Sequence, residues 1–223
     1  MVSLLSENVS HAYGFFHALK GVSLEINPGD CFALFGPNGA GKTTLMKIFA
    51  TLLSPTQGQL SILGKDAVRD RDTVRASIFF VGHGSFLYDD LTAIENIEFA
   101  IGIRGRLPPL NEIKTVLDRV GIGAYASQKT RTLSAGMQKR LSLAKTILAQ
   151  PELILFDEPY TALDENGVEM MHQVIRDFLA RGAAVILSSH DRAKTAQIAN
   201  RAGLLHHKTL KEIPLTDLQN ALF

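Results

Sequence analysis

Nine consecutive residues near the start of the chain constrain its fold most strongly: Gly36-Pro37-Asn38-Gly39-Ala40-Gly41-Lys42-Thr43-Thr44. They match the pattern GxxxxGK[ST], in which glycines let the backbone curl so that successive N–H groups face the phosphates of a nucleotide. We expect Lys42 to reach the β- and γ-phosphates and the Thr43 hydroxyl to ligate Mg²⁺. By itself this phosphate loop indicates a purine nucleotide and nothing narrower.

Strands and helices alternate around the loop. Residues 1–35 indicate strands joined by turns, and the apolar run Cys31–Phe35 leads directly into the loop. Residues 42–53 have helical spacing, with Leu45, Ile48, Phe49 and Leu52 on one face. Further strands are expected at 59–63, 77–81, 153–156 and 184–187, of which 77–81 reads as central and the last two as members of a parallel sheet. This order predicts an α/β fold.

A mostly helical stretch interrupts that order between residues 85 and 131. Residues 91–99 and 111–120 have helical spacing, separated by Leu107-Pro108-Pro109. A helix then begins at Ser134, and another spans 165–181. We expect a single domain over residues 1–223, in which 1–84 and 132–223 form the catalytic core and 85–131 form an inserted helical subdomain.

Composition excludes several classes of protein. The 23 basic and 22 acidic residues nearly cancel, so the net charge of +1 offers no nucleic-acid footprint. A single cysteine, Cys31, excludes an internal disulfide framework. The N-terminus does not resemble a signal peptide, and no apolar run approaches the roughly 20 residues that cross a bilayer. We therefore expect any membrane role to come through a partner.

Two adjacent carboxylates, Asp157 and Glu158, follow the apolar run 153–156. In a phosphate-loop enzyme the first acid holds Mg²⁺, directly or through water, opposite Thr43. The second is placed to orient or deprotonate the attacking water. An isolated pair of acids at a strand end is usually a solvated turn, but the upstream phosphate loop and the following Pro159 favour catalysis.

The segment Leu133-Ser134-Ala135-Gly136-Met137 resembles the L-S-G-G-Q signature of the ATP-binding-cassette (ABC) family. Over essentially its whole length the chain is similar to the nucleotide-binding subunit of an ABC transporter. The resemblance implies an ATPase with a RecA-like phosphate-loop NTPase core, a parallel sheet, an N-terminal antiparallel β part and the inserted helical subdomain. It also implies a head-to-tail dimer induced by ATP, or pairing with a second ATP-binding subunit.

In such a dimer the signature of one subunit closes over the ATP held by the other. Ser134 is a good N-cap, and small residues at a helix N-terminus leave N–H groups free for a γ-phosphate. Ala135 and Met137 depart from the family pattern. Alanine still allows a close approach beside Gly136, whereas Met137 cannot repeat a hydrogen bond made by a glutamine side chain.

Three other residues occupy family positions. Tyr13 corresponds to the aromatic residue that stacks on adenine, with core packing as the alternative and Phe16 as a nearby rival. Asp164 belongs to the loop that crosses the dimer interface, and it could equally serve as a helix N-cap or do both. His190 corresponds to the switch histidine that contacts the γ-phosphate, although an isolated histidine is usually structural.

His83 is the most informative departure from the family. Most members carry there a glutamine that touches Mg²⁺ and the water and joins the helical subdomain to the membrane partner. A neutral imidazole can bind a metal-bound water or the γ-phosphate, so His83 could do part of that work. The alternative is a loop histidine with no contact to the nucleotide.

Local motifs also resemble the ATP-binding subunit of the cytochrome c maturation system, a haem exporter. They are Gly82-His83, residues 91–97, Leu133–Gly136 and the run from Asp157 to Asp164. Met137 and Tyr160 depart from that subfamily. The resemblance implies integral-membrane permease partners and a cytoplasmic location on the inner face of the membrane. The alternatives are the ATPase of another exporter, of multidrug, polysaccharide or lipid type, and a soluble non-transport ABC ATPase.

Overall fold

An antiparallel sheet forms the N-terminal part of the computed structural model, which describes residues 1–82 and 86–218. It contains β1 (Leu4–Tyr13), β2 (Phe16–Ile26), β4 (Gln57–Ile62) and β5 (Lys65–Asp66), in the order β2-β1-β4-β5. Apolar residues alternate along these strands, as in a sheet with one buried face. The expected N-terminal antiparallel β part is confirmed.

A second, six-stranded sheet has the order β10-β9-β3-β8-β7-β6. Its strands are β3 (Cys31–Phe35), β6 (Ile78–Val81), β7 (Leu153–Asp157), β8 (Ala184–Ser188), β9 (Arg201–His206) and β10 (Thr209–Ile213). All neighbours are parallel except β10 and β9. The parallel pairing of residues 153–156 with 184–187 is therefore confirmed, and both strands are fully buried.

The expectation that residues 77–81 form a central strand is wrong. Among the described residues β6 pairs with β7 alone and so lies at the edge of the sheet. The guanidinium of Arg104 lies beside it and donates to the carbonyls of Ala76 and Ile78. It also lies 5.6 Å from the ring centroid of Phe79. An apolar edge strand covered in this way has the same sequence pattern as a central one.

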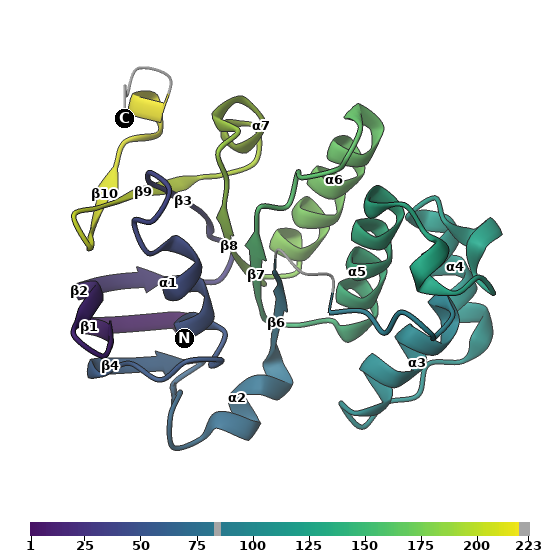
Figure 1. Ribbon diagram of the computed structural model, residues 1–223, viewed down its shortest axis with the longest axis horizontal. Helices are drawn as coiled ribbons and strands as arrows, with labels where there is room; N and C mark the ends of the chain where they lie inside the picture. The colour runs from purple at the N-terminus through teal and green to yellow at the C-terminus, as the bar shows by residue number, and fades with distance from the viewer. Residues whose placement is uncertain (83–85, 219–223) are drawn as a thin grey trace.

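Seven α-helices are described: α1 (Lys42–Phe49), α2 (Arg71–Ser77), α3 (Ala93–Gly102), α4 (Leu110–Arg119), α5 (Ala135–Ala149), α6 (Glu165–Ala180) and α7 (Arg192–Ala196). Short 3₁₀ turns cover Gly123–Tyr125, Thr130–Thr132 and Leu215–Leu218. Figure 1 shows the N-terminal sheet at one end of the molecule, α3 and α4 at the other, and the parallel sheet between them. The chain is thus α/β, as expected.

The parallel sheet is covered on both faces because its strands are apolar on both sides. In β3, Phe32 and Leu34 face a core shared with α1 and the N-terminal sheet. Cys31, Ala33 and Phe35 face a second core that includes α5 and α6. This arrangement fixes the loop between β3 and α1 at the carboxyl end of the sheet, where α/β proteins bind their ligands.

The first helix is shorter than expected. It ends at Phe49, and Thr51 adopts a left-handed backbone conformation with φ of 58°. Leu52, expected on the buried face, is therefore about half exposed, at 48%. The expected starts of two later helices are confirmed, because the side chains of Ser134 and Asp164 cap α5 and α6. Helices α2 and α7 and strands β9 and β10 were not expected.

The segment between residues 86 and 131 packs on α5 through its own apolar residues. Thr92 and Glu95 form a reciprocal capping box that starts α3. Ile97 of α3 and Leu117 of α4 belong to the same buried cluster as Leu141 of α5. The described part of this stretch is mostly helical, as expected, since it contains α3 and α4.

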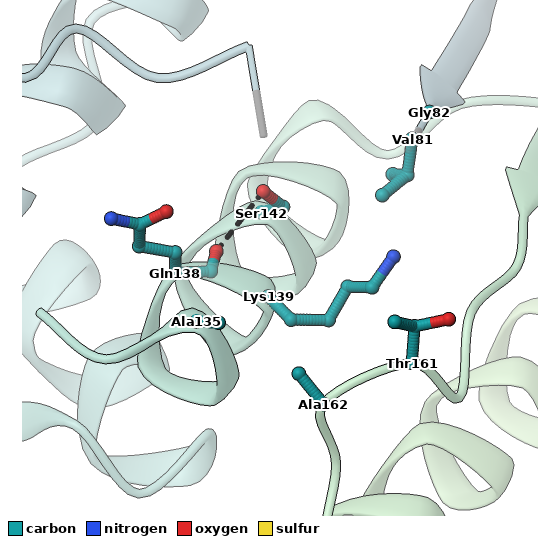
Figure 2. A pocket seen from close by; sticks show the side chains of 8 residues that line it. All are labelled: Val81, Gly82, Ala135, Gln138, Lys139, Ser142, Thr161 and Ala162. Atoms are coloured by element: carbon teal, nitrogen blue, oxygen red, sulfur yellow. Dashed lines mark hydrogen bonds between the residues drawn. The ribbon is translucent and has the colours of Figure 1, made fainter. Parts of the chain in front are cut away.

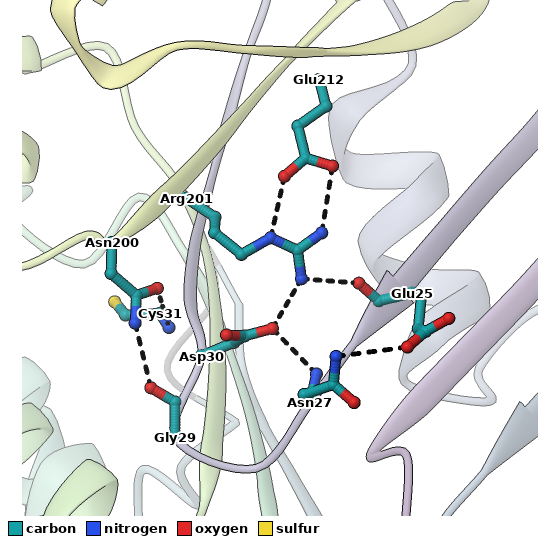
Figure 3. Close-up of polar contacts among 8 residues, drawn as sticks. All are labelled: Glu25, Asn27, Gly29, Asp30, Cys31, Asn200, Arg201 and Glu212. Carbon is teal, nitrogen blue, oxygen red and sulfur yellow. Dashed lines mark hydrogen bonds and ion pairs between the residues drawn. The ribbon is translucent and has the colours of Figure 1, made fainter.

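Arg201 joins the C-terminal hairpin to the rest of the molecule (Figure 3). Its guanidinium binds both carboxylate oxygens of Glu212, at 2.8 and 3.0 Å, across β9 and β10. The same group donates to Asp30 at 2.6 Å and to the carbonyl of Glu25 at 2.8 Å. Arg201 therefore connects β9, β10, the end of β2 and the turn before β3.

Candidate nucleotide-binding site

A cavity of about 280 Å³ lies where the phosphate loop meets the ends of the parallel strands. Residues from four separate segments line it: Tyr13, Phe16, Ala18, Asn38, Gly39, Gly41, Lys42, Thr43, Thr44, Asp157, Glu158 and His190. Parallel strands bring their carboxyl ends to one edge of a sheet, so the segments after β3, β7 and β8 meet there, while Tyr13, Phe16 and Ala18 come from β1 and β2 of the N-terminal sheet. Gly36, Pro37 and Asn38 line an adjoining hollow with His190.

The phosphate loop is held tightly against its neighbours. A Cβ atom on Gly36 would lie 2.3 Å from the carbonyl oxygen of Leu205, and one on Gly41 would lie 2.8 Å from that of Ala18. Only glycine fits such close backbone approaches. Within the loop the N–H of Ala40 donates to the carbonyl of Pro37 at 3.2 Å. No side chain caps the start of α1, so its first N–H groups face the cavity without a side-chain acceptor.

Lys42 is buried and folds back on the loop. Its Nζ donates to the carbonyl of Gly36 at 2.7 Å and to that of Pro37 at 3.1 Å. Burial lowers the pKa of Lys42, while the carboxylates of Glu158 and Asp157 oppose that shift. The ammonium is thus held among oxygen atoms beside the cavity, and a phosphate could exchange for the two carbonyls.

Thr43 and Asp157 meet as expected for a shared cation. The Thr43 hydroxyl donates to Asp157 Oδ2 at 3.2 Å, and Ser188 donates to the other carboxylate oxygen. A hydroxyl and a buried carboxylate are ligands that suit Mg²⁺. The described residues contain no cluster of three or more His, Cys, Asp or Glu side chains that could hold a metal. A Mg²⁺ ion here would therefore take its remaining ligands from phosphate and water.

Glu158 and His190 face each other at the ends of neighbouring strands. The ring nitrogen Nε2 of His190 lies 3.2 Å from Glu158 Oε1. The backbone N–H of His190 donates to the other carboxylate oxygen, Oε2, at 3.4 Å. Glu158 has a left-handed backbone, with φ of 52°, and its N–H donates to the carbonyl of Ser188. Such a conformation in a non-glycine residue persists only where its surroundings fix it. The carboxylate lines the cavity, and a carboxylate placed in this way can act as a general base.

Two aromatic residues also line the cavity. Tyr13 and Phe16 pair across the turn between β1 and β2 and are 49% and 59% exposed. Tyr13 packs edge-on against His11, and Lys208 lies 4.9 Å from the centroid of Phe16. Tyr13 is therefore not a core residue, and both rings remain candidates for stacking on a base.

The signature segment is separate from this cavity. Ser134 caps α5 by accepting from the N–H of Met137 at 3.2 Å. Gly136 approaches the loop after Glu158 so closely that a Cβ would lie 2.7 Å from the carbonyl oxygen of Ala162. Ala135 lines a second cavity, of about 140 Å³, into which Lys139 points between Val81 and Thr161 (Figure 2). None of residues 134–137 lines the phosphate-loop cavity in the same chain.

Asp164 is the N-cap of α6, which was the alternative expected for it. Its carboxylate accepts from the N–H of Gly167 at 2.8 Å and pairs with Arg140 at 2.9 Å. The hydrogen bond from Gly167, and then the contacts with Arg140, lower its pKa. The side chain remains 66% exposed, so a contact with another chain is also open to it. His83 lies outside the described residues.

Two residues that sequence reasoning missed are Ser188, which orients Asp157, and Lys139. Ser188 could have been found, because it directly follows the strand expected beside the acid-bearing strand. Lys139 gives no such signal. Its helix carries apolar and basic residues around most of its surface, and only the packing shows which of them point inward. Burial lowers the pKa of Lys139, and the charges of Asp157 and Glu158 oppose the shift.

A phosphate loop at the end of a parallel strand, with a threonine and an acid pair beside it, defines a phosphate-loop nucleotide-binding protein. Comparison with known families narrows this class. The family model described as ABC transporter matches residues 19–161. The chain therefore belongs to the ABC transporter family, and it is an ATP-binding subunit of the ATP-hydrolysing kind.

Individual relatives agree with this assignment. The cytochrome c biogenesis ATP-binding export protein CcmA 2 of Cupriavidus metallidurans is 35% identical over 78% of this chain and 82% of its own length. The lipoprotein-releasing system ATP-binding protein LolD of Bacteroides fragilis is 34% identical over 87% and 94%. The dimeric, post-hydrolysis structure of the cassette MJ0796 with ADP and Pi superposes with a TM-score of 0.86, at 28% identity over 95% and 98%. In the described part of this chain no helix could span a bilayer.

Proposed function

We propose that the chain hydrolyses Mg·ATP with the residues that line the phosphate-loop cavity. Lys42 and the backbone of residues 36–44 hold the phosphates, and Thr43 and Asp157 hold the Mg²⁺ ion that neutralises them. Glu158 accepts the proton of the attacking water, and His190 contacts the γ-phosphate. The observation that carries this proposal is the meeting of all these side chains around one cavity. Tyr13 or Phe16 stacks on the adenine.

A second ATP-binding subunit completes the site. Residues 134–137 do not reach the cavity of their own chain, yet α5 presents an N-terminus with small residues. Such a terminus suits the γ-phosphate of ATP held by another copy. The dimeric MJ0796 relative supports this arrangement. We infer a head-to-tail dimer formed on ATP binding, with Asp164 at the interface, as a homodimer or with a second ATP-binding subunit.

The motor would act on a separate membrane permease, which would hold it at the cytoplasmic face of the membrane. In this view residues 1–84 and 132–223 form the catalytic core, and the helical subdomain 85–131 transmits closure to the permease. His83 would take the place of the glutamine that usually contacts Mg²⁺ and water. Wild-type ATPase activity in His83→Ala would contradict that role. The net charge of +1 gives no reason to expect a nucleic-acid partner.

Haem export in cytochrome c maturation is the cargo we favour. Several relatives that the chain matches over about three quarters of its length are named for that system, at 32–35% identity. The lipoprotein-releasing relative favours a second candidate, since it matches more of this chain at nearly the same identity. The local motifs thus support haem as the cargo. The larger share of the chain that the lipoprotein-releasing relative matches supports a lipid-linked cargo.

Identifying the permease that binds the chain distinguishes between these two cargoes. The tagged Glu158→Gln variant, expected to stay closed on ATP, is purified from membranes of the source cells with Mg·ATP. Bound membrane proteins are then identified by mass spectrometry. Recovery of cytochrome c maturation permeases supports haem export. Recovery of a lipoprotein-releasing permease instead overturns it, and Lys42→Met serves as the control that cannot close on ATP.

A further inference from the structure

A buried histidine packs against one of the two aromatic rings that line the nucleotide cavity. His11 lies in β1, two residues before Tyr13, and is only 8% exposed, whereas Tyr13 is 49% exposed. The two rings meet edge-on, with centroids 4.7 Å apart and planes at 79°. Residues two apart in a strand point to the same face of the sheet. The inner ring of His11 therefore supports the outer ring of Tyr13.

A hydrogen bond fixes the orientation of the His11 ring. Its Nδ1 lies 3.0 Å from the backbone carbonyl oxygen of Ser54, in the segment between α1 and β4. A carbonyl can only accept, so Nδ1 carries a proton and donates it. The same segment binds β1 again, because the N–H and the hydroxyl of Thr56 donate to the carbonyl of Ser10 at 2.8 and 3.1 Å. The ring is thus held between β1 and the segment that follows α1, the helix that begins in the phosphate loop.

The second aromatic ring of the cavity has a different neighbour. Phe16 pairs with Tyr13 across the turn between β1 and β2. The ammonium of Lys208, from the turn between β9 and β10, lies over the Phe16 ring, 4.9 Å from its centroid. A cation in this position occupies one face of the ring. Of the two rings, Tyr13 is therefore the one that packs against a second ring within the described part of the chain.

We propose that His11 is a positioning residue for adenine binding, which holds the Tyr13 ring in the orientation that stacks on the base. A half-exposed tyrosine without such a support changes rotamer freely, and a ligand must then order it on binding. The pairing of β1 with β2 shifts register on both sides of His11, and irregularities of this kind re-aim side chains beside binding sites. His11 is not among the described residues that line the cavity, so it should affect only ligands that carry a base.

This inference rests on the proposed binding of nucleotide at the phosphate loop, and a ligand without a base separates the two. Calorimetric titrations with Mg·ADP and with Mg·pyrophosphate compare the wild type with His11→Ala. The Kd for ADP should rise about five-fold, because ordering a freed side chain costs a factor of about two to ten. The Kd for pyrophosphate should stay unchanged. His17→Ala, which removes an exposed histidine of β2, is the matched control and should change neither value.

A double-mutant cycle connects the effect to the Tyr13 ring. Tyr13→Ala should raise the Kd for ADP about ten-fold, the effect of losing one stacking ring. His11→Ala combined with Tyr13→Ala should raise it no further, since the histidine then has no ring to position. His11→Asn keeps an N–H for the Ser54 carbonyl but lacks the ring, and it should weaken ADP as His11→Ala does.

The possible results distinguish the two claims. An unchanged Kd for ADP in both His11 variants overturns the positioning role, and so do additive effects in the cycle. Equal weakening of ADP and pyrophosphate in these variants also overturns it, because His11 would then support the phosphate loop in general. Unweakened binding of both ligands by Lys42→Met overturns the proposed nucleotide site instead.

Discussion

The imidazole Nε2 of His190 lies 3.2 Å from Oε1 of Glu158, across the carboxyl ends of two neighbouring parallel strands. This contact predicts that the two residues act on the same reacting centre. Glu158→Gln should lower kcat by about 10²–10⁴-fold, the range of a lost general base. The Kd for ATP should stay near the wild-type value, because the amide is nearly isosteric. Steady-state ATPase assays and calorimetric titration with ATP measure both, and a variant that hydrolyses ATP normally would contradict the assignment.

Lys42 should control binding rather than the stability of the fold. Its buried ammonium donates to the carbonyls of Gly36 and Pro37 in its own loop, so Lys42→Met should leave the unfolding temperature unchanged or slightly raised. Losing its charge-assisted bonds to phosphate should weaken ATP binding about a hundred-fold. Titration calorimetry and thermal unfolding without nucleotide test both halves. Tight ATP binding by Lys42→Met would refute the proposed contact.

Lys145 should make stability depend on pH in the alkaline range. Burial lowers the pKa of this lysine from 10.5 to about 8, and its Nζ donates to the carbonyl of Phe86 at 2.9 Å. Between those two pKa values the unfolded chain binds more protons than the folded chain, so stability rises with pH. The contribution of Lys145 between about pH 7 and about pH 10 is about 2 kcal/mol.

Urea unfolding of wild type and Lys145→Met at both ends of that range measures this contribution. The wild type should gain stability relative to the variant as the pH rises. Other alkaline titrations cancel in the comparison, since both proteins share them. Parallel changes in the two proteins would show that Lys145 titrates as an ordinary exposed lysine.

Arg201 should be important for stability, since it joins β9, β10 and the turn before β3 (Figure 3). Arg201→Met leaves the mostly buried Asp30 without its cation and should lower the free energy of unfolding by about 2–3 kcal/mol. Arg69→Met is the matched control. Its ion pair with Asp66 spans 3.9 Å on the surface and should contribute almost nothing. Equal effects of the two substitutions in chemical denaturation would contradict this account.

Local motifs made much of the site predictable. The phosphate loop requires its glycines because Gly36 and Gly41 touch the backbones of Leu205 and Ala18, and the pattern carries that requirement directly. Asp157 ends a fully buried strand and Glu158 directly follows it, so their place at the carboxyl end of the sheet follows from the strand itself. The caps formed by Ser134 and Asp164 were equally readable, because a cap depends on residues three positions apart.

Long-range packing explains what could not be predicted. The apolar run Ile78–Val81 does not reveal whether one strand or two lie beside it, and the covering Arg104 comes from the turn that follows α3. Arg201 meets Asp30 across 171 positions of sequence. The inward direction of Lys139 depends on how α5 packs against β6 and the loop after Glu158. Such relationships appear only when the chain is folded.

The shared nucleotide site is the central claim, and the mass of the Glu158→Gln variant in solution tests it most directly. Light scattering after size-exclusion chromatography in Mg·ATP should give about twice the 24.3 kDa of one chain. The same variant in Mg·ADP should elute as a monomer, and so should Glu158→Gln/Ser134→Arg in Mg·ATP, although it still binds nucleotide. A Glu158→Gln protein that binds ATP yet stays monomeric at concentrations well above the Kd for ATP would contradict the account. So would a dimer that forms equally well when Ser134 is replaced by arginine.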